Sequence, residues 1–414
     1  MAPGIDQLAA TISASTRTII NHLDEHNLPH PSFDADGPIM LNLSPQAEHA
    51  RSTAIAALEE LLDLLQGPIA CMFPRYNATS LQVISRHDIA RKVPMEGKIS
   101  FAELAKATDL HVIDLRRIIR FAMSFHRLFT EPQEGFVAHS AGSKVLATDE
   151  IVRAGVAQSY DEFYGFLGRT ADALDSFKDC EPNHTGFALA RNTDMNMFDF
   201  LRTQPSKANQ FSKAMRCYTA SEPGYSESYL LEGYDWDSLG EATVVDVGGA
   251  DGHISKALSK AYPRLNMVVE DLPDVVAAAE SAGSTERVQY RAHDFFSTQP
   301  VMEADVYLFR WIFHDWPDHY VIRILQAQVP ALRKGTKLII NESLNPPPGS
   351  LPLTLQRTTC FMDMMLLAVN NARLRTLSEW QEIFSAADDR FGAVRCVTTQ
   401  GAAIAILEVI WEGQ

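Results

Sequence analysis

The chain has 414 residues, with 36 Lys and Arg against 52 Asp and Glu, and so carries a formal charge of −16. This acidity argues against non-specific binding to nucleic acids or anionic membranes, which depends on clustered Lys and Arg. The five cysteines are widely spaced without a CxxC pair, so we expect neither a disulfide framework nor a metal site. The sequence shows no apolar run long enough to span a membrane and no secretory signal, which predicts a cytoplasmic protein without a membrane partner.

The first 165 residues are predicted to form a mostly helical domain. Apolar residues recur at helical spacing in the segments 12–23 and 54–65, on either side of a loop at 28–38. The pair Gly67-Pro68 predicts the end of the second helix. That helix carries leucines nearly all around its axis, which predicts a homodimer formed through this region. These leucines are Leu58, Leu61, Leu62, Leu64 and Leu65.

Residues 83–140 have the pattern of a winged helix, in which two helices are followed by a β-hairpin. Ser100 is placed to cap a short helix, Phe101–Ala107, with a glutamate at the capping-box position. A longer helix with one apolar side follows, and two short β segments then flank a turn that contains Pro and Gly. Winged helices also occur in DNA-binding proteins. Residues 83–145, however, hold ten Lys and Arg against seven Asp and Glu, too small an excess to indicate that function.

From residue 241 onward, short apolar runs alternate with helical patterns, which is typical of a parallel sheet covered by helices on both faces. The strand-like runs are Thr243–Val247, Leu265–Val269, Val288–Tyr290, Val306–Phe309 and Leu338–Ile340. Two further runs, Val394–Thr398 and Ala402–Trp411, predict a hairpin that adds an antiparallel strand. The predicted fold is therefore α/β, with a mixed sheet that follows a helical winged-helix domain.

The first strand runs directly into a glycine-rich turn, which is typical of nucleotide-binding α/β domains. The turn contains Asp246, Gly248, Gly249 and Gly252. Glycines allow the backbone to approach a ligand closely. The spacing does not match the dinucleotide fingerprint GxGxxG, and so favours a ligand without a pyrophosphate.

The later strands also end in polar or aromatic residues. Asp271 ends the second strand about 20 residues past the glycines, where an acid accepts hydrogen bonds from a ribose diol. Asp294 and Phe295 follow the third strand, and an acid beside an aromatic ring suits an adenine. The fourth strand leads into His314 and Asp315, which two tryptophans bracket. The fifth strand would place a glutamate beside that histidine, as an orienting acid lies beside the histidine of a catalytic triad.

The motifs DVGGADG, EDLPDVV, AHDFF, RWIFHDWPD and NESLNP, in this order, resemble the plant- and fungal-type S-adenosylmethionine-dependent O-methyltransferases of the caffeate and flavonoid class. The resemblance covers nearly the whole chain, and the N-terminal extension is more similar to fungal members. It implies a class I methyltransferase fold. It also implies a dimerisation domain at 1–165 and a catalytic domain at 166–414. The implied cofactor is S-adenosyl-L-methionine, with S-adenosyl-L-homocysteine as the product.

The resemblance also implies roles for individual residues. The implied cofactor-binding residues are Asp246, Gly248, Gly249, Gly252, Asp271, Asp294, Phe295, Arg310 and Trp311, with Arg310 where the family usually has Lys. His314 would be the general base, Asp315 the neighbouring acid that touches the acceptor, and Glu342 an acid that flanks the base. The positions that would line the acceptor pocket are Met195, Phe198, Met215, Asp363, Met364 and Leu367. The family's second flanking acid is replaced by Leu374. This predicts an apolar flank that lowers the pKa of His314.

The predicted reaction is methyl transfer to the phenolic or enolic hydroxyl of an aromatic secondary metabolite. A phenol has a pKa of about 10 and a histidine one of about 6.5, so complete prior proton transfer to an ordinary histidine costs roughly 4.8 kcal/mol. We therefore expect His314 to take the proton as the new bond forms. Two alternatives on the same scaffold are N-methyl transfer and a pericyclase that uses the cofactor only as a fixed charge. The presence of both His314 and Glu342 argues against the pericyclase.

Overall fold

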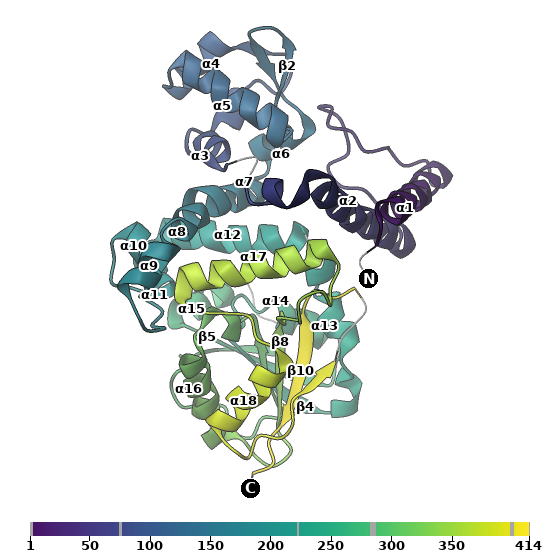
Figure 1. Cartoon of the computed structure of the whole chain (residues 1–414). Helices are drawn as coiled ribbons and strands as arrows, with labels where there is room; N and C mark the ends of the chain where they lie inside the picture. The colour runs from purple at the N-terminus through teal and green to yellow at the C-terminus, as the bar shows by residue number, and fades with distance from the viewer. Residues whose placement is uncertain (1–2, 74–76, 222, 282–286, 398–400, 414) are drawn as a thin grey trace. The chain divides into compact units, whose positions relative to one another are not determined.

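A computed structural model of the chain describes residues 3–73, 77–221, 223–281, 287–397 and 401–413 (Figure 1). The chain forms two compact units. The first comprises Met1–Gly165, Gln204–Cys217 and Pro348–Thr358, and the second comprises Phe166–Thr203, Tyr218–Pro347 and Thr359–Gln414. The two later segments of the first unit lie within the range that the sequence assigned to the catalytic domain. The division into a dimerisation and a catalytic domain stays a prediction. None of the helices in the described residues is long and apolar enough to cross a membrane.

The first unit begins with two helices that pack against each other, α1 (Ile5–Glu25) and α2 (Pro45–Cys71). The prediction that Gly67-Pro68 ends the second helix is confirmed. Gly67 has φ +75° and ψ 168°, outside the helical region, so the regular helix stops there, and a short helical segment follows the kink up to Cys71. Most of the predicted leucine surface is open in the single chain. Leu58, Leu62, Leu64 and Leu65 are between 45% and 66% exposed.

The winged-helix prediction is confirmed. Ser100 caps the first helix in a capping box, because its side chain accepts from the Glu103 N–H while the Glu103 side chain accepts from the Ser100 N–H. The strands form a three-stranded antiparallel sheet in the order β1-β3-β2. The elements are β1 (Ile99–Ser100), α4 (Phe101–Thr108), α5 (Val112–Phe125), β2 (Thr130–Gln133) and β3 (Phe136–Ala138). The other helices of this unit are α3 (Thr79–Arg86), α6 (Ala141–Thr148), α7 (Glu150–Ala157), α8 (Tyr164–Leu167, which reaches into the second unit) and α12 (Pro205–Ser221).

The second unit contains a seven-stranded sheet in the order β6-β5-β4-β7-β8-β10-β9. Strands β4 to β8 pair in parallel, and β10 runs antiparallel to both β8 and β9, so the predicted mixed sheet with a C-terminal hairpin is confirmed. The turn predicted within this hairpin lies largely outside the described residues. The strands are β4 (Ala242–Val247), β5 (Leu265–Asp271), β6 (Val288–Ala292), β7 (Val306–Arg310), β8 (Lys337–Glu342), β9 (Arg395–Val397) and β10 (Ala405–Ile410).

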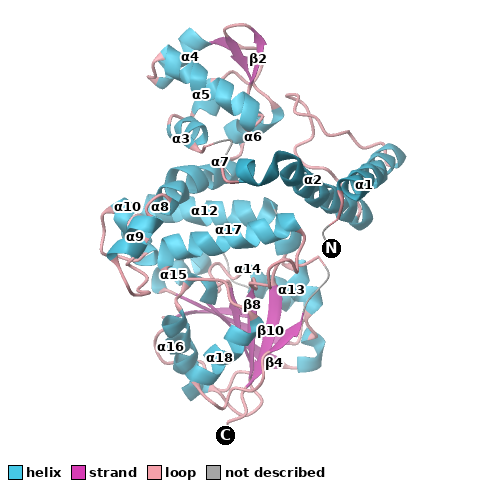
Figure 2. Ribbon diagram, viewed as in Figure 1, coloured by secondary structure: helices cyan, strands magenta, loops and turns pink. Residues whose placement is uncertain are grey.

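Helices cover both faces of this sheet because its parallel strands are apolar on both sides (Figure 2). One face packs against α16 (Asp318–Gln328) and α18 (Leu377–Ala387), and the other packs against α13 (Ser228–Gly233) and α14 (His253–Ala261). The remaining helices are α9 (Thr170–Ser176), α10 (Gly186–Arg191), α11 (Met197–Thr203), α15 (Pro273–Ser281) and α17 (Leu353–Asn370, which begins in the first unit). The parallel pairing brings the carboxyl ends of β4, β5, β7 and β8 to one edge, where ligands bind in open α/β sheets.

Candidate active site

The glycine-rich turn after β4 is packed too tightly for side chains at two of its glycines. Gly248 has φ +74°, and a Cβ there would lie 2.5 Å from Cδ1 of Ile312. A Cβ on Gly249 would lie 2.7 Å from the carboxyl carbon of Asp246. Packing against Ile312 and Asp246 therefore requires glycine at these two positions, and the turn carries no side chains there that would keep a ligand from its backbone.

Two carboxylates lie next to this turn, Asp246 at the end of β4 and Asp271 at the end of β5. Asp246 is buried and its Oδ2 accepts a hydrogen bond of 2.6 Å from the hydroxyl of Ser255 in α14, and burial raises its pKa to about 6. Asp271 accepts from the backbone N–H groups of Ala250 at 2.9 Å and Leu272 at 2.7 Å. Burial raises the pKa of Asp271 as well. The structure therefore places Asp271 directly beside the glycine turn, and gives Asp246 a bond to the helix that follows it.

The residues predicted to contact an adenine lie after β6. Asp294 is exposed, and its Oδ1 accepts the N–H of Phe296 at 3.0 Å. The Phe295 ring lies near Gly248, with one ring carbon 3.9 Å from the position of an added Cβ. It also meets Trp316 edge to face at 6.2 Å between ring centroids. Phe295 thus covers the glycine turn from one side, while Asp294 shapes its own loop.

Arg310 and Trp311 lie at the end of β7. Arg310 donates to the side chain of Asn341 and, at 3.3 Å, to the backbone oxygen of Tyr225. Trp311 has φ +54°, a left-handed conformation that is uncommon for a bulky residue. Its indole nitrogen is buried and has no hydrogen-bond partner among the residues that the structure describes. An unpaired buried donor at a sheet edge is a position where a ligand acceptor is favoured. Together with the bare glycine turn and Asp271, it fits a polar nucleoside cofactor.

His314 and Glu342 meet as the sequence predicted. Oε2 of Glu342, at the end of β8, accepts a 2.5 Å hydrogen bond from Nδ1 of His314. Oε1 of the same carboxylate accepts from the backbone N–H groups of Phe313 at 2.9 Å and His314 at 3.3 Å. The carboxylate therefore fixes both the ring and the 3₁₀ turn η5 (Phe313–Asp315) that carries it. Nε2 is the ring nitrogen left for another partner, and it lies 3.6 Å from Oδ1 of Asp315.

Two acids make His314 a stronger base than an ordinary histidine. Burial alone would lower its pKa, but the charges of Glu342 and Asp315 and the bond to Glu342 outweigh burial and raise it to about 9. The expectation that the apolar Leu374 flank lowers this pKa is therefore wrong. Leu374 is buried and contributes no charge, so Glu342 on β8 and Asp315 on the turn of His314 decide the sign of the pKa shift. Burial also raises the pKa of Asp315, to about 6.

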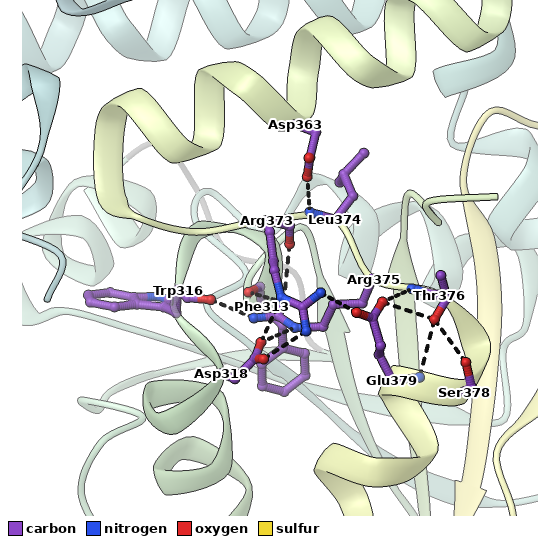
Figure 3. A network of polar contacts seen from close by, with 10 residues as sticks. All are labelled: Phe313, Trp316, Asp318, Asp363, Arg373, Leu374, Arg375, Thr376, Ser378 and Glu379. Atoms are coloured by element: carbon purple, nitrogen blue, oxygen red, sulfur yellow. Dashed lines mark hydrogen bonds and ion pairs between the residues drawn. The ribbon is translucent and has the colours of Figure 1, made fainter. Parts of the chain in front are cut away.

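The positions predicted to line the acceptor pocket are only partly brought together. Phe198 on α11 stacks on Trp316 at 5.7 Å between centroids, two residues beyond His314. Asp363 on α17 accepts the N–H of Leu374 at 2.7 Å (Figure 3). Leu367 is half-buried, whereas Met195 and Met364 are 42% and 48% exposed. Met215 belongs to the first compact unit, so its place relative to these residues stays a prediction.

Two residues that fix this edge of the sheet are not among those predicted from the sequence. Ser255 holds Asp246, and Arg375 bonds to the backbone on both sides of His314 (Figure 3). Arg375 follows Leu374 in a segment that contains two arginines, and the sequence carries no signal to tell the buried arginine from the half-exposed Arg373. For Ser255, its position three residues after the last glycine of the turn was a usable signal, because it faces back along the first helical turn.

The chain is similar to known proteins in both sequence and fold. Residues 175–389 match the O-methyltransferase domain family. The chain is 40% identical over 417 aligned residues to the grayanic acid biosynthesis cluster O-methyltransferase of Cladonia grayi, covering 100% of this chain and 89% of that protein. It is 41% identical to the O-methyltransferase pyvH of Aspergillus violaceofuscus, covering 99% of each chain. The crystal structure of OxaC superposes with a TM-score of 0.76 at 20% identity, over 98% of this chain and 100% of that one, which supports the fold.

The family match over residues 175–389 and the identity with named enzymes over the full length lead to one conclusion. The chain belongs to the family of S-adenosylmethionine-dependent O-methyltransferases.

Proposed function

We propose that the protein methylates a phenolic or enolic hydroxyl of an aromatic secondary metabolite, with His314 as the general base. The observation that carries this proposal is the arrangement of His314 between Glu342 at 2.5 Å and Asp315 at 3.6 Å. The stacked rings of Phe198 and Trp316 beside it support an aromatic acceptor. A relative at 40% identity that is named for a biosynthesis cluster supports a secondary metabolite.

The raised pKa of His314 suits the removal of a phenolic proton. A phenol with a pKa of about 10 lies only about one unit above His314, so proton transfer costs ~1.4 kcal/mol instead of the larger cost for an ordinary histidine. Glu342 holds Nδ1, so the proton goes to Nε2. Asp315, next to Nε2, stabilises the imidazolium that forms and orients the acceptor hydroxyl.

The cofactor residues are proposed from the same edge of the sheet. The bare backbone at Gly248, Gly249 and Gly252 would hold the methionine part, and Asp271 would accept the ribose hydroxyls. Phe295 would pack on the adenine. When bound, S-adenosylmethionine supplies the methyl group from a sulfonium and becomes S-adenosylhomocysteine. The chain's own part is to fix the two reactants in contact, which removes much of the entropic barrier.

The alternatives differ in what they need from His314. A pericyclase needs no proton acceptor beside two acids. Methyl transfer to the nitrogen of a neutral amine depends less on a proton acceptor than methyl transfer to a phenol does. The test uses cofactor with a labelled methyl group and a panel of hydroxybenzoates, hydroxynaphthalenes and matched anilines. We expect label in the hydroxylated acceptors. Label only in the anilines, or conversion of an acceptor without label, would favour one of the other two reactions.

The first prediction concerns the base. His314→Ala should lower kcat by about 10² to 10⁴, the usual contribution of a general base. Its affinity for the cofactor should be unchanged, because the His314 side chain bonds to Glu342 and Asp315 and not to the glycine turn. His319→Ala is the control, since His319 lies five residues away on α16 and is exposed. Near-full methyl transfer by His314→Ala would show that the base assignment is wrong.

The second prediction concerns pH. Only neutral His314 accepts a proton, so kcat/KM should rise about tenfold per pH unit toward a plateau near the histidine's pKa of about 9. Glu342→Gln and Asp315→Asn each remove a negative charge that raises this pKa. Both should therefore move the rising limb to lower pH, and Glu342→Gln should lower kcat less than His314→Ala does. A limb that stays in place in both variants would mean that another group titrates.

The third prediction concerns the cofactor. Asp271→Ala should weaken cofactor binding at least tenfold, because hydrogen bonds to an ionised acceptor are each worth about 1.5–3 kcal/mol. Calorimetry measures this, with the exposed Asp274→Ala on α15 as the control. Asp271→Asn keeps an acceptor for only one of the two backbone N–H groups, because Ala250 donates to Oδ2 and Leu272 to Oδ1, so the melting temperature of each variant reports whether the turn is retained. An unchanged dissociation constant would remove Asp271 from the cofactor site.

The fourth prediction concerns assembly. We infer a homodimer formed through the N-terminal helices, because α2 exposes leucines that a soluble monomer would not leave in contact with water. Sedimentation at micromolar concentration should give about twice the mass of 46.0 kDa. Leu62→Glu combined with Leu65→Glu should shift the protein to monomer, whereas the same change at Ile113, an exposed residue of α5, should not. A wild-type mass of one chain would contradict the dimer.

A further inference from the structure

The short turn that carries His314 is held by hydrogen bonds from two directions. Glu342 accepts from the N–H groups of Phe313 and His314. Arg375 donates to the carbonyl oxygens of Phe313 at 2.9 Å and Trp316 at 2.7 Å (Figure 3). These two carbonyls bracket His314 and Asp315. One carboxylate and one guanidinium therefore hold the donors and the acceptors of the same turn.

Both the side chain and the backbone of Arg375 are held by neighbouring residues. Its side chain is 1% exposed, and its Nε donates to Oδ1 of Asp318 at 2.9 Å. Its guanidinium lies over the ring of Trp380, 5.5 Å from the ring centroid. Its backbone oxygen accepts the N–H of Asn345 at 3.0 Å, three residues past Glu342. Arg375 is thus anchored to the segment that directly follows Glu342 at the end of β8.

We propose that Arg375 is a positioning residue of the reaction, which fixes the turn Phe313–Asp315 so that Nε2 of His314 meets the acceptor hydroxyl. The inference rests on the proposed function of His314. A planar guanidinium suits this task because its two Nη groups reach two carbonyls at once, which an ammonium group does not. A base displaced by about 1 Å loses on the order of 10²-fold in rate, so the fixation of a turn of three residues matters to kcat.

Arg375 also acts on the charge of the base. The charged groups that influence His314 are Glu342 on β8, Asp315 on its own turn and Arg375 on the segment after α17. The two acids raise the pKa of His314, and the arginine cation lowers it. Because Leu374 brings no acid, Arg375 leaves a larger neutral fraction of His314 at a given pH than the two acids alone would allow. A residue that only supported the fold would have no such effect on the pH profile.

The test compares Arg375→Met and Arg375→Lys with the wild-type enzyme, on the phenol of the panel that the wild type methylates fastest. In Arg375→Met we expect kcat to fall about 10- to 100-fold while the KM for the cofactor changes less than twofold. The rising limb of the pH profile should move to higher pH, opposite to the shift in Glu342→Gln. Arg375→Lys should leave the rising limb of the pH profile in place and recover only part of kcat. Lysine keeps the positive charge but lacks the planar guanidinium with its two Nη donors.

Arg373→Met is the matched control. Arg373 binds the same Asp318 and also Glu379, but it makes no bond to the turn of His314. Its substitution should change kcat less than twofold and leave the pH profile in place. This variant therefore separates loss of the ion-pair network from loss of the bonds to the turn.

The inference is overturned if folded Arg375→Met keeps kcat within twofold of the wild type, or if Arg375→Lys recovers kcat fully. Melting temperature and cofactor affinity report whether each variant is folded, and if the Met variant is not, Arg375→Lys decides. An NMR titration of His314 in the ligand-free protein, assigned with His314→Ala, should give a higher pKa in Arg375→Met than in the wild type. This titration tests the effect of Arg375 on His314 without any methyl transfer. A wild-type enzyme without methyltransferase activity would contradict only the proposed function.

Discussion

The active edge of this protein depends on one buried carboxylate. Glu342 is 1% exposed and accepts three hydrogen bonds, two from backbone N–H groups and one from the ring of His314. A buried charge is costly unless such bonds satisfy it, so the turn that carries the histidine has to close onto the end of β8. The histidine's tautomer, its orientation and the sign of its pKa shift all follow from this contact.

The sheet makes that contact possible. β7 and β8 pair in parallel, so Arg310 and Glu342 end at the same edge, and the chain leaving β7 has only a few residues in which to turn. Trp311 takes a left-handed conformation at that point. Strain of this kind persists where surrounding contacts over-determine the backbone. The N–H of Trp311 donates to the backbone oxygen of Asn341 on β8 at 3.2 Å, and Glu342 and Arg375 hold the turn that follows. The same edge carries the glycine turn and Asp271, so the cofactor side and the base side share one rigid frame.

The charges at this edge have opposing tasks. Two acids beside His314 make it basic enough for a phenol, yet a base that is too strong stays protonated at neutral pH. Arg375 moderates the acids from a third element. Leu374 lies where the family has a second flanking acid, so the local balance differs from the family pattern. The rate of proton removal therefore depends on how the backbone of the turn Phe313–Asp315 is held, as well as on the side chain of His314.

The sequence by itself determined the fold class, the winged helix, the order of the strand-end motifs and the pairing of His314 with Glu342. These follow from local signals: apolar periodicity, capping residues, glycines at a strand end, and the rule that parallel strands end at one edge. The break in α2 at Gly67 follows from the same kind of local signal, because the residue before a proline disfavours the helical conformation.

Only the tertiary structure decided the charge state of His314 and the role of Arg375. The Leu374 substitution predicted a lowered pKa when the chain was considered one segment at a time. One of the acids that reverse the sign, Asp315, is next to His314 in the chain, but the other, Glu342, lies 28 residues away on β8, and the sheet sets its distance to the ring. A buried arginine looks like any other in a sequence. Its function depends on which carbonyls it meets, and that is a property of the packed chain.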